Sequence, residues 1–518
     1  MNSLFPTPLF RQHARRAGTA ALALTLVLVS GCKDFLDVPP QGQLSEDAIR
    51  TDPAAAQKLV DGVYNALYLG GFGPDINGLQ FVILTDIASD DSDKGSSPND
   101  YRDALDVDNF TLNSTNGNIN NVWNGHYQGI SRANQALDKI PLSPATDAVK
   151  NRLLGEVRFL RGYLYFNLVR LFGGVPLLDR VPATSEVNNP DLQKRATADA
   201  IYALIISDLQ FAADNLPLKG ATETGRATKA AAQGMLAKVY LYQKNYQKAY
   251  DLTNDIITGK SGSYSLYPIY ADIFRTPGAN SSESVFEVQT GVNAACNNSA
   301  VELYTVSQGP RSGGKGGWAD LGFGFNSPTK ALADAYEPKD IRKAGSIIFI
   351  DTSAAKRGTV LWDGFRIPSK DSVENTRYSY KAYHSRTKEP NCGNNDFLPK
   401  NIRVLRYAEV LLIHAEAAVQ TGKDADALTD LTAVRTRAGL DSKPATLANI
   451  WQERRVELAL EHDRFFDLVR QESVQPGRIV PLFAAQGKTF VKSKNELFPI
   501  PQPQIDLSGG QLTQNPGY

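Results

Sequence analysis

One stretch of the chain, residues 158–177, constrains the fold more than any other. Its sequence, RFLRGYLYFNLVRLFGGVPL, is apolar or aromatic on nearly every side of a helix. A helix of that kind must be buried. A Ser-Pro pair at 143–144 signals the start of this helix, and a Gly-Gly pair at 173–174 signals its end. We therefore predict a helix over residues 147–172, about 39 Å long, around which the other helices pack.

Other helical segments can be grouped in pairs. The expected pairs are 54–69 with 121–140, 147–172 with 197–215, 228–243 with 246–258, and 406–421 with 424–438. Ala237 and Ala249 stand twelve residues apart, as Ala415 and Ala427 do, and small residues at such points let two helices cross closely. We predict a mainly α fold, a tetratricopeptide-like helical-repeat scaffold whose stacked pairs bury one continuous core.

Long stretches between these helices have a different composition. Two insertions, about 70–120 and 280–400, are rich in Gly, Ser, Asn and Asp, and carry short strand-like runs at 285–289, 347–350 and 378–383. Long loops within a compact protein are commonly functional. We expect the helices to supply rigidity and these irregular insertions, with their short β-strands, to form the binding surface.

Residues 1–31 are predicted to be an export signal that is removed. Three arginines precede an apolar run at 17–29, which is too short to span a bilayer. The sequence Val-Ser-Gly-Cys at 29–32 is typical of a lipoprotein processing site, with Cys32 as the acylated first residue. Acyl chains would hold the protein on a membrane without crossing it. The alternative is an ordinary secretory signal with a cysteine just past the cut.

The mature chain, residues 32–518, is interpreted as one domain because no long Pro/Ser/Gly linker divides it. Removing three arginines leaves 52 basic against 55 acidic residues, a net charge of −3. Nucleic acid is therefore not an expected partner. Cys296 and Cys392 lie in a compartment that permits disulfides, but sequence alone leaves their pairing open.

Motifs for catalysis or cofactor binding are absent from the sequence. It contains no H-E-x-x-H, C-x-x-C or G-x-S-x-G pattern, and we predict no cofactor and no metal. Acidic residues of the late helices, Glu416, Glu453, Glu457 and Glu461, stand at helical spacing among arginines, which favours structural ion pairs. The acidic segment 90–95 departs from a calcium-loop pattern, so a solvated acidic loop is favoured over a cation site.

Several sequence blocks resemble, in the same order, those of the SusD/RagB family of nutrient-binding surface lipoproteins. They are W-x3-Y-x2-I-x2-A-N at 123–134, E-x-RFLRGYLYFNLVRLFGGVPL at 156–177, VLRYAEVLLIHAEA at 404–417, VRTRAGL at 434–440, ERRVELALEHDRFFDLVR at 453–470, LFPIP at 497–501 and QNPGY at 514–518. The resemblance implies a non-catalytic outer-membrane lipoprotein that faces the cell exterior. It would bind a nutrient oligomer, with a glycan favoured, and deliver it to a SusC-like TonB-dependent transporter.

Ligand sites in that family resemble a shallow arc of aromatic rings with a few polar residues, borne by the non-repeat segments. By position in the chain, the candidates are Tyr101 and Arg102 in the first insertion and Tyr304, Arg311 and Trp318 in the second. An aromatic face can pack on sugar C–H groups while polar side chains bind the hydroxyls. For each candidate, a packed or merely exposed side chain is the competing interpretation.

Two other functions stay open at this point. A helical-repeat scaffold could bind proteins or peptides through its concave face. A surface glycoside hydrolase would need two carboxylates about 5 to 9.5 Å apart across a cleft. The sequence does not choose the ligand, which could be a glycan or a peptide.

Overall fold

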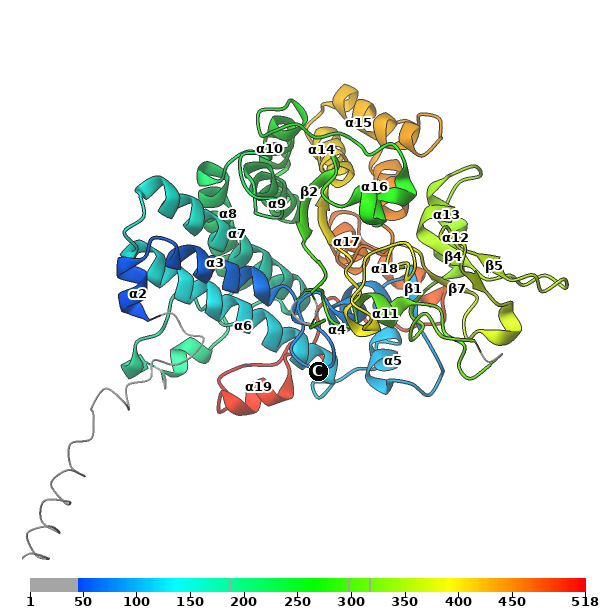
Figure 1. Cartoon of the computed structure of the whole chain (residues 1–518), viewed down its shortest axis with the longest axis horizontal. Helices are drawn as coiled ribbons and strands as arrows, with labels where there is room; N and C mark the ends of the chain where they lie inside the picture. Colours follow the sequence, from blue (N-terminus) through cyan, green and yellow to red (C-terminus); the bar gives the residue numbers. More distant parts are fainter. Residues whose placement is uncertain (1–44, 187–188, 294, 297–298, 316–317) are drawn as a thin grey trace, which may run out of the picture.

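The structure is a computed structural model that describes residues 45–186, 189–293, 295–296, 299–315 and 318–518. The predicted signal segment 1–31 and Cys32 lie outside the described residues. The fold is mainly α-helical (Figure 1). Its longer helices are α3 (Ala55–Ala66), α6 (Gly117–Lys139), α7 (Asp147–Phe172), α8 (Ala198–Asn215), α9 (Lys229–Tyr242), α10 (Tyr246–Ile257), α14 (Tyr407–Gln420), α15 (Asp424–Arg437), α16 (Leu447–Glu457) and α17 (Arg464–Val474).

Helix α7 has the predicted bounds and is buried on nearly all sides over its second half. Gly173 ends it with a φ of +72°, in the left-handed region that favours glycine. The start differs in detail from the prediction, because the N-cap is Thr146, whose hydroxyl accepts a hydrogen bond from the Val149 N–H. Ser143 instead ends the short 3-10 turn Ile140–Leu142 that precedes the helix.

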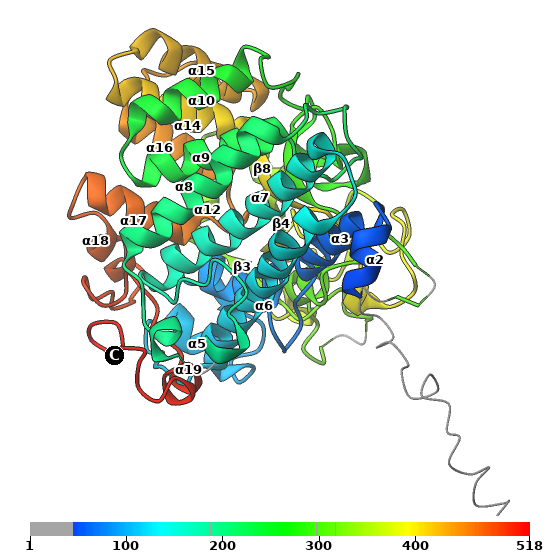
Figure 2. The ribbon, with the colours of Figure 1, turned by 90° about the vertical axis from the view of Figure 1, so that its left-hand side faces the viewer.

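The predicted helix pairs are confirmed, since α3 packs on α6, α7 on α8, α9 on α10, and α14 on α15. Helix α8 also packs on α9, and α10 on α14, so the pairs form one continuous stack. Figures 1 and 2 show this stack running from the blue and cyan helices to the orange α15. The four alanines Ala237, Ala249, Ala415 and Ala427 are fully buried, which is what close helix crossing requires.

Gly125, inside α6, has no space beside it for a side chain. A Cβ atom there would lie 2.3 Å from the main-chain oxygen of Asp75, which is far inside van der Waals contact. We expect Gly125→Ala to destabilise the protein by about 1 to 3 kcal/mol, although alanine is the better helix former. Gly62 in α3 is the matched control, because its Cβ would meet nothing within 4 Å. Gly62→Ala should stabilise by about 0.5 to 1 kcal/mol. Urea denaturation of both variants checks the pair, and equal effects would contradict it.

The remaining helices and all strands are short. The helices are α2 (Glu46–Thr51), α4 (Leu79–Val82), α5 (Arg102–Asp108), α11 (Tyr304–Gln308), α12 (Lys330–Ala335), α13 (Arg342–Ser346), α18 (Ile479–Ala484) and α19 (Gln502–Leu507), with a π-helical turn, η2, at Ile83–Ile87. The strands are β1 (Ser92–Gly95), β2 (Ser284–Val288), β3 (Phe325–Pro328), β4 (Ile347–Phe349), β5 (Thr359–Val360), β6 (Arg366–Ile367), β7 (Arg377–Ser379) and β8 (Ile402–Arg406).

These strands form antiparallel pairs that join distant segments. Strand β1 pairs with β3, β2 with β8, β4 with β7, and β5 with β6. The β1–β3 pair, with Gly95 opposite Phe325, therefore places the first predicted insertion against the second. The β2–β8 pair leads directly into α14, which attaches the insertions to the helical stack. Figure 1 shows β4, β5 and β7 on the side away from α3 and α8.

The acidic segment 90–95 is not the solvated loop that its composition favoured. Asp90 and Asp91 are buried, and two arginines from the late helices, Arg455 and Arg464, pair with them. The two Arg464–Asp90 hydrogen bonds measure 2.6 and 2.9 Å. Buried carboxylates need such partners because desolvation of an unpaired charge is costly. No cluster of acidic, His or Cys side chains suited to a metal occurs among the described residues.

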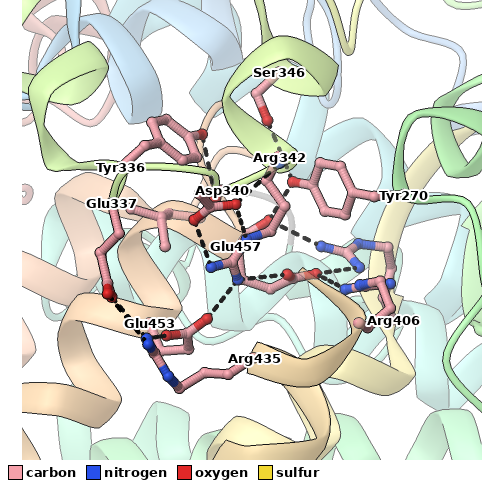
Figure 3. A network of polar contacts seen from close by, with 12 residues as sticks. Tyr270, Tyr336, Glu337, Asp340, Arg342, Ser346, Arg406, Arg435, Glu453 and Glu457 are labelled. Carbon is pink, nitrogen blue, oxygen red and sulfur yellow. Dashed lines mark hydrogen bonds and ion pairs between the residues drawn. The ribbon is translucent and has the colours of Figure 1, made fainter. Parts of the chain in front are cut away.

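The late glutamates form ion pairs, as the sequence indicated. Their partners, however, come from other elements and not from the same helix. Glu457 of α16 lies between Arg342 and Arg406, as Figure 3 shows, and Glu453 pairs with Arg342 and Arg435. Glu416 likewise pairs with Arg470 of α17. The network therefore ties α13, β8, α15 and α16 together.

Two further features concern the chain as a whole. Cys296 and Cys392, whose pairing the sequence left open, are joined by a disulfide with their Cα atoms 5.6 Å apart. It closes a loop across the second insertion and so restricts its conformations. In the part of the chain that the structure describes, none of the helices combines the length and the apolar character that crossing a membrane demands.

Candidate functional site

A phenylalanine of the first insertion projects from the surface. The Phe72 side chain is 63% exposed, compared with 39% for Phe349, another phenylalanine of the insertions. The Phe72 ring stands edge-on to Tyr101, with ring centroids 5.9 Å apart. A large exposed apolar ring costs free energy in water unless a ligand or partner covers it.

The main chain around Phe72 is held in place by buried polar groups. The Gln80 amide, which is fully buried, donates hydrogen bonds to the main-chain oxygens of Gly71 (3.0 Å) and Gly73 (3.1 Å). The Asn121 side chain donates to the Phe72 oxygen at 3.2 Å. Gly71 has a φ of +76°, which a residue with a side chain rarely adopts. The ring is therefore presented by a fixed turn, which lowers the entropy lost on binding.

A carboxylate lies beside this turn. The main-chain oxygen of Glu302 accepts a hydrogen bond from the Gly71 N–H at 3.2 Å. A Cβ on Gly71 would lie 2.8 Å from the Glu302 carboxyl carbon, so the acid directly contacts the turn. Partial burial, together with nearby Asp396, raises the pKa of Glu302. Because no hydrogen bond from the described residues occupies that carboxyl group, it is available to bind a hydroxyl.

Of the two candidates in the first insertion, Tyr101 packs against Phe72, and Arg102 follows it in the chain. The Tyr101 ring lies between Phe72 and Phe325, with both centroid distances 5.9 Å, and its hydroxyl donates to the Asn118 side chain at 2.6 Å. Its φ of 45° is left-handed, which is uncommon for a side chain of this size. Arg102 is exposed and pairs with Asp106 at 3.0 Å.

Arg311 joins the two insertions. Its guanidinium group forms an ion pair with Asp100, next to Tyr101, and donates to the Ser96 hydroxyl. Burial alone would raise the pKa of Asp100, but the hydrogen bond from Arg311 holds that pKa below its ordinary value. The main-chain oxygen of Arg311 accepts from the Glu374 N–H at 2.9 Å. Arg311 therefore fixes the loop that carries Tyr101 and is itself half-buried.

Tyr304 lies beneath this surface. It is 8% exposed, and its hydroxyl bonds the His462 ring at 3.0 Å. The other His462 nitrogen lies 2.9 Å from the Asp86 carboxylate. Burial alone would lower the pKa of His462, but the neighbouring Asp86 carboxylate raises that pKa above its ordinary value.

The structure thus places Tyr101 against Phe72 and ties Arg311 to Asp100, the residue before Tyr101. Arg102 is exposed beside Tyr101, whereas Tyr304 is buried against His462.

Trp318 lies in a separate small core of the second insertion. Its indole N–H donates to the Ser372 oxygen at 2.7 Å, and its half-buried ring is 6.5 Å from Phe365. The residues of this core include Leu321, Ile348, Ile367, Val373 and Tyr378. One side of the ring is therefore used in packing.

We expect Trp318→Ala to lower the free energy of unfolding by about 1 to 3 kcal/mol, through lost apolar contact and the lost Ser372 hydrogen bond. Trp318→Phe, which keeps the apolar ring, should lose less. Urea denaturation of the two variants measures both effects. Unchanged stability in Trp318→Ala would show that its ring contributes nothing to this core.

Family models match both halves of the chain. Residues 276–518 match the model described as SusD family, and residues 34–241 match the model described as starch-binding associating with outer membrane. The chain belongs to the SusD family.

Individual members of the SusD family align over almost their whole length. A SusD-like protein P2 of Formosa agariphila is 27% identical over 520 residues, covering 96% of this chain and 98% of the relative. A solved laminarin-binding SusD-like protein is 29% identical with a TM-score of 0.75, covering 90% of this chain and 99% of that protein. Surface glycan-binding protein A from Bacteroides fluxus is 25% identical, with a TM-score of 0.73 and coverage of 90% and 99%.

Phe72 and Glu302 were not predicted as site residues of this SusD-family chain. Gly71 and Gly73 on either side of Phe72 were the available signal, since a large ring between two glycines points to a turn with an exposed side chain. The contact with Glu302 could not be read from the sequence, because it depends on how the second insertion folds against the first.

Proposed function

We propose that this chain is a glycan-binding lipoprotein of the outer membrane that faces the cell exterior. In this proposal residues 1–31 are removed and Cys32 carries the acyl chains. The Phe72 face, defined as Phe72, Tyr101, Arg102, Glu302 and Arg311, binds an oligosaccharide. The protein is not an enzyme, and it passes the oligosaccharide to a SusC-like TonB-dependent transporter.

The observation that carries this proposal is the fixed, outward-facing ring of Phe72 next to a carboxylate. A sugar ring packs its C–H patches on an aromatic face and directs its hydroxyls to polar groups at the edge. Phe72 supplies the apolar face, Glu302 an acceptor, and Arg102 a donor. Relatives named for laminarin and surface-glycan binding support the same class of ligand.

A carbohydrate array tests the binding step. The probe is a soluble form that begins after Cys32, applied to neutral and acidic oligosaccharides and to a set of peptides. We expect binding to one class of glycan, with no new reducing ends after incubation with the matching polysaccharide. Binding only to peptides would favour the scaffold alternative, and released reducing ends would favour a hydrolase.

The delivery step needs a separate experiment in the native membrane. Detergent extraction under mild conditions, followed by affinity purification and mass spectrometry, should recover the chain with a TonB-dependent transporter and with acyl groups on Cys32. A variant with Cys32→Ser should fail to reach the membrane fraction. Recovery of the acylated protein only as a free monomer would count against the transporter partnership.

A further inference from the structure

A cavity of about 410 Å³ lies apart from the Phe72 face, between residues 274–280, the end of β2 and the segment 384–403. Its size is within the range of sites for small molecules. Its polar walls include Arg275, Asn280, Gln289, His384, Lys400 and Arg403. None of these residues belongs to the Phe72 face.

Lys400 is the least compensated charge in this wall. Its side chain is buried, with only 6% of the residue exposed, and its ammonium group donates to the Phe274 oxygen. Among the described residues no carboxylate lies within ion-pair distance of this ammonium group, and Glu389, which lies 3.4 Å from His384, acts on it from farther away. Burial lowers the pKa of Lys400 to about 8, even though Glu389 acts in the opposite direction. An ammonium group can donate three hydrogen bonds, so two donors remain for another acceptor.

Two arginines add positive charge to the same walls. Arg403 is 8% exposed, its Nε atom lies 3.7 Å from a Glu287 oxygen, and that nitrogen has no hydrogen-bond partner among the described residues. Arg275 pairs with Asp272 at 2.6 Å and lies 4.7 Å from the Trp362 ring.

Glu389, the acidic residue of the cavity wall, already accepts hydrogen bonds from the protein itself. The Glu389 carboxylate accepts hydrogen bonds from the Thr276 N–H (2.9 Å), the Thr276 hydroxyl (3.1 Å) and the Ser385 N–H (2.8 Å). His384 adds no charge near neutral pH, because burial lowers its pKa to about 4.

Arg275 and Arg403 have the carboxylates of Asp272 and Glu287 close by. Lys400 has only Glu389, which acts on it from beyond ion-pair distance, so Lys400 is the cation of this wall with the weakest counter-charge. A buried cation with so distant a counterion is costly.

We infer that this cavity is a subsite for an anionic group of the glycan, a uronate carboxylate or a sulfate ester. Such a group would supply a closer counter-charge to Lys400 than Glu389 does, and would accept charge-assisted hydrogen bonds from Lys400 and Arg403. The inference rests on the proposed function, because it assigns the anion to a glycan. It adds that the preferred glycan is acidic.

Matched acidic and neutral glycans test the subsite. The probes are a galacturonic acid tetramer with its carboxyl-reduced form, and a sulfated galactan oligomer with its desulfated form. Isothermal titration calorimetry with the soluble protein should show one acidic member bound at least tenfold more tightly than its neutral form. Lys400→Met should remove this preference and leave the neutral affinity unchanged. Lys400→Arg should retain most of the preference, and the exposed control Lys260→Gln all of it.

The outcomes separate this subsite from the Phe72 face. Equal affinity for acidic and neutral members of both pairs, or a preference that survives in Lys400→Met, would overturn the subsite. If Lys400→Met does not fold, Arg275→Gln replaces it, because Arg275 lies at the partly exposed edge of the cavity. It too should remove the preference for the acidic glycan. A failure of the proposed function looks different, because Phe72→Ala would then leave the affinity for both members of a pair unchanged.

Discussion

Glu457→Gln is expected to lower the free energy of unfolding by about 3 to 5 kcal/mol, because it removes one partner of a buried ion network. Glu457 is fully buried. Its carboxylate pairs with Arg342 at 3.1 Å and Arg406 at 3.0 Å, both labelled in Figure 3. A third arginine, Arg437, pairs with it at 2.5 Å. Glutamine has nearly the same shape, so the loss measures charge and not a cavity. Urea denaturation at neutral pH gives the value.

The matched control is Glu46→Gln, which breaks an ion pair with Arg50 in which both side chains are half exposed. It should leave stability unchanged, because solvent screens such pairs. A loss in Glu457→Gln no larger than in this control would show that the network is not a source of stability.

The same network predicts a pH dependence. Burial alone would raise the pKa of Glu457. The pKa is instead held far below its ordinary value by three arginines, Arg437, Arg406 and Arg342. A carboxylate with a lowered pKa contributes stability above its ordinary pKa, near 4.3, and that contribution is lost as the pH falls below it. The wild-type protein should therefore lose stability below about pH 4 more steeply than Glu457→Gln.

Phe72→Ala is expected to weaken glycan binding by about 1.5 to 3 kcal/mol, or roughly 10- to 150-fold, which is the worth of burying one such ring. The ring is 63% exposed, so its removal should change the unfolding free energy little. Calorimetric titration with the glycan identified on the array measures the affinity. Phe72→Trp should retain binding, because it keeps an aromatic face at the same turn.

Leu507→Ala is the control for this change. Leu507 is 78% exposed on α19, and its truncation also removes apolar surface from the protein's exterior. Its glycan affinity should equal that of the wild type. An equal loss in both variants would mean that Phe72 acts through general surface properties and not through contact with the sugar.

The helical stack could be predicted from the sequence, because its signals are local. The signals for α7 lie within the helix itself: its apolar positions and the left-handed Gly173 that ends it. The alanine spacing of α9 and α10 lies within a single helix pair. The late glutamates were also correctly interpreted as structural. Their partners were not, since Arg342 and Arg406 lie on other elements.

The insertions could not be predicted in the same way, because distant partners decide their conformation. Asp90 and Asp91 appeared solvated by composition, yet Arg455 and Arg464 neutralise them from the far end of the chain. The exposure of Phe72 depends in turn on Gln80 and on the second insertion. Contacts of this kind follow from tertiary packing, which no local pattern contains.

Hydrogen–deuterium exchange of the soluble protein, with and without the bound glycan, tests most directly whether the insertions bind the ligand while the helices serve as support. We expect slower exchange at 70–75, 96–102 and 301–304, and unchanged exchange along α8, α9 and α10. Slower exchange along those helices, with none at the three insertion segments, would contradict this account and favour a binding surface on the helical stack.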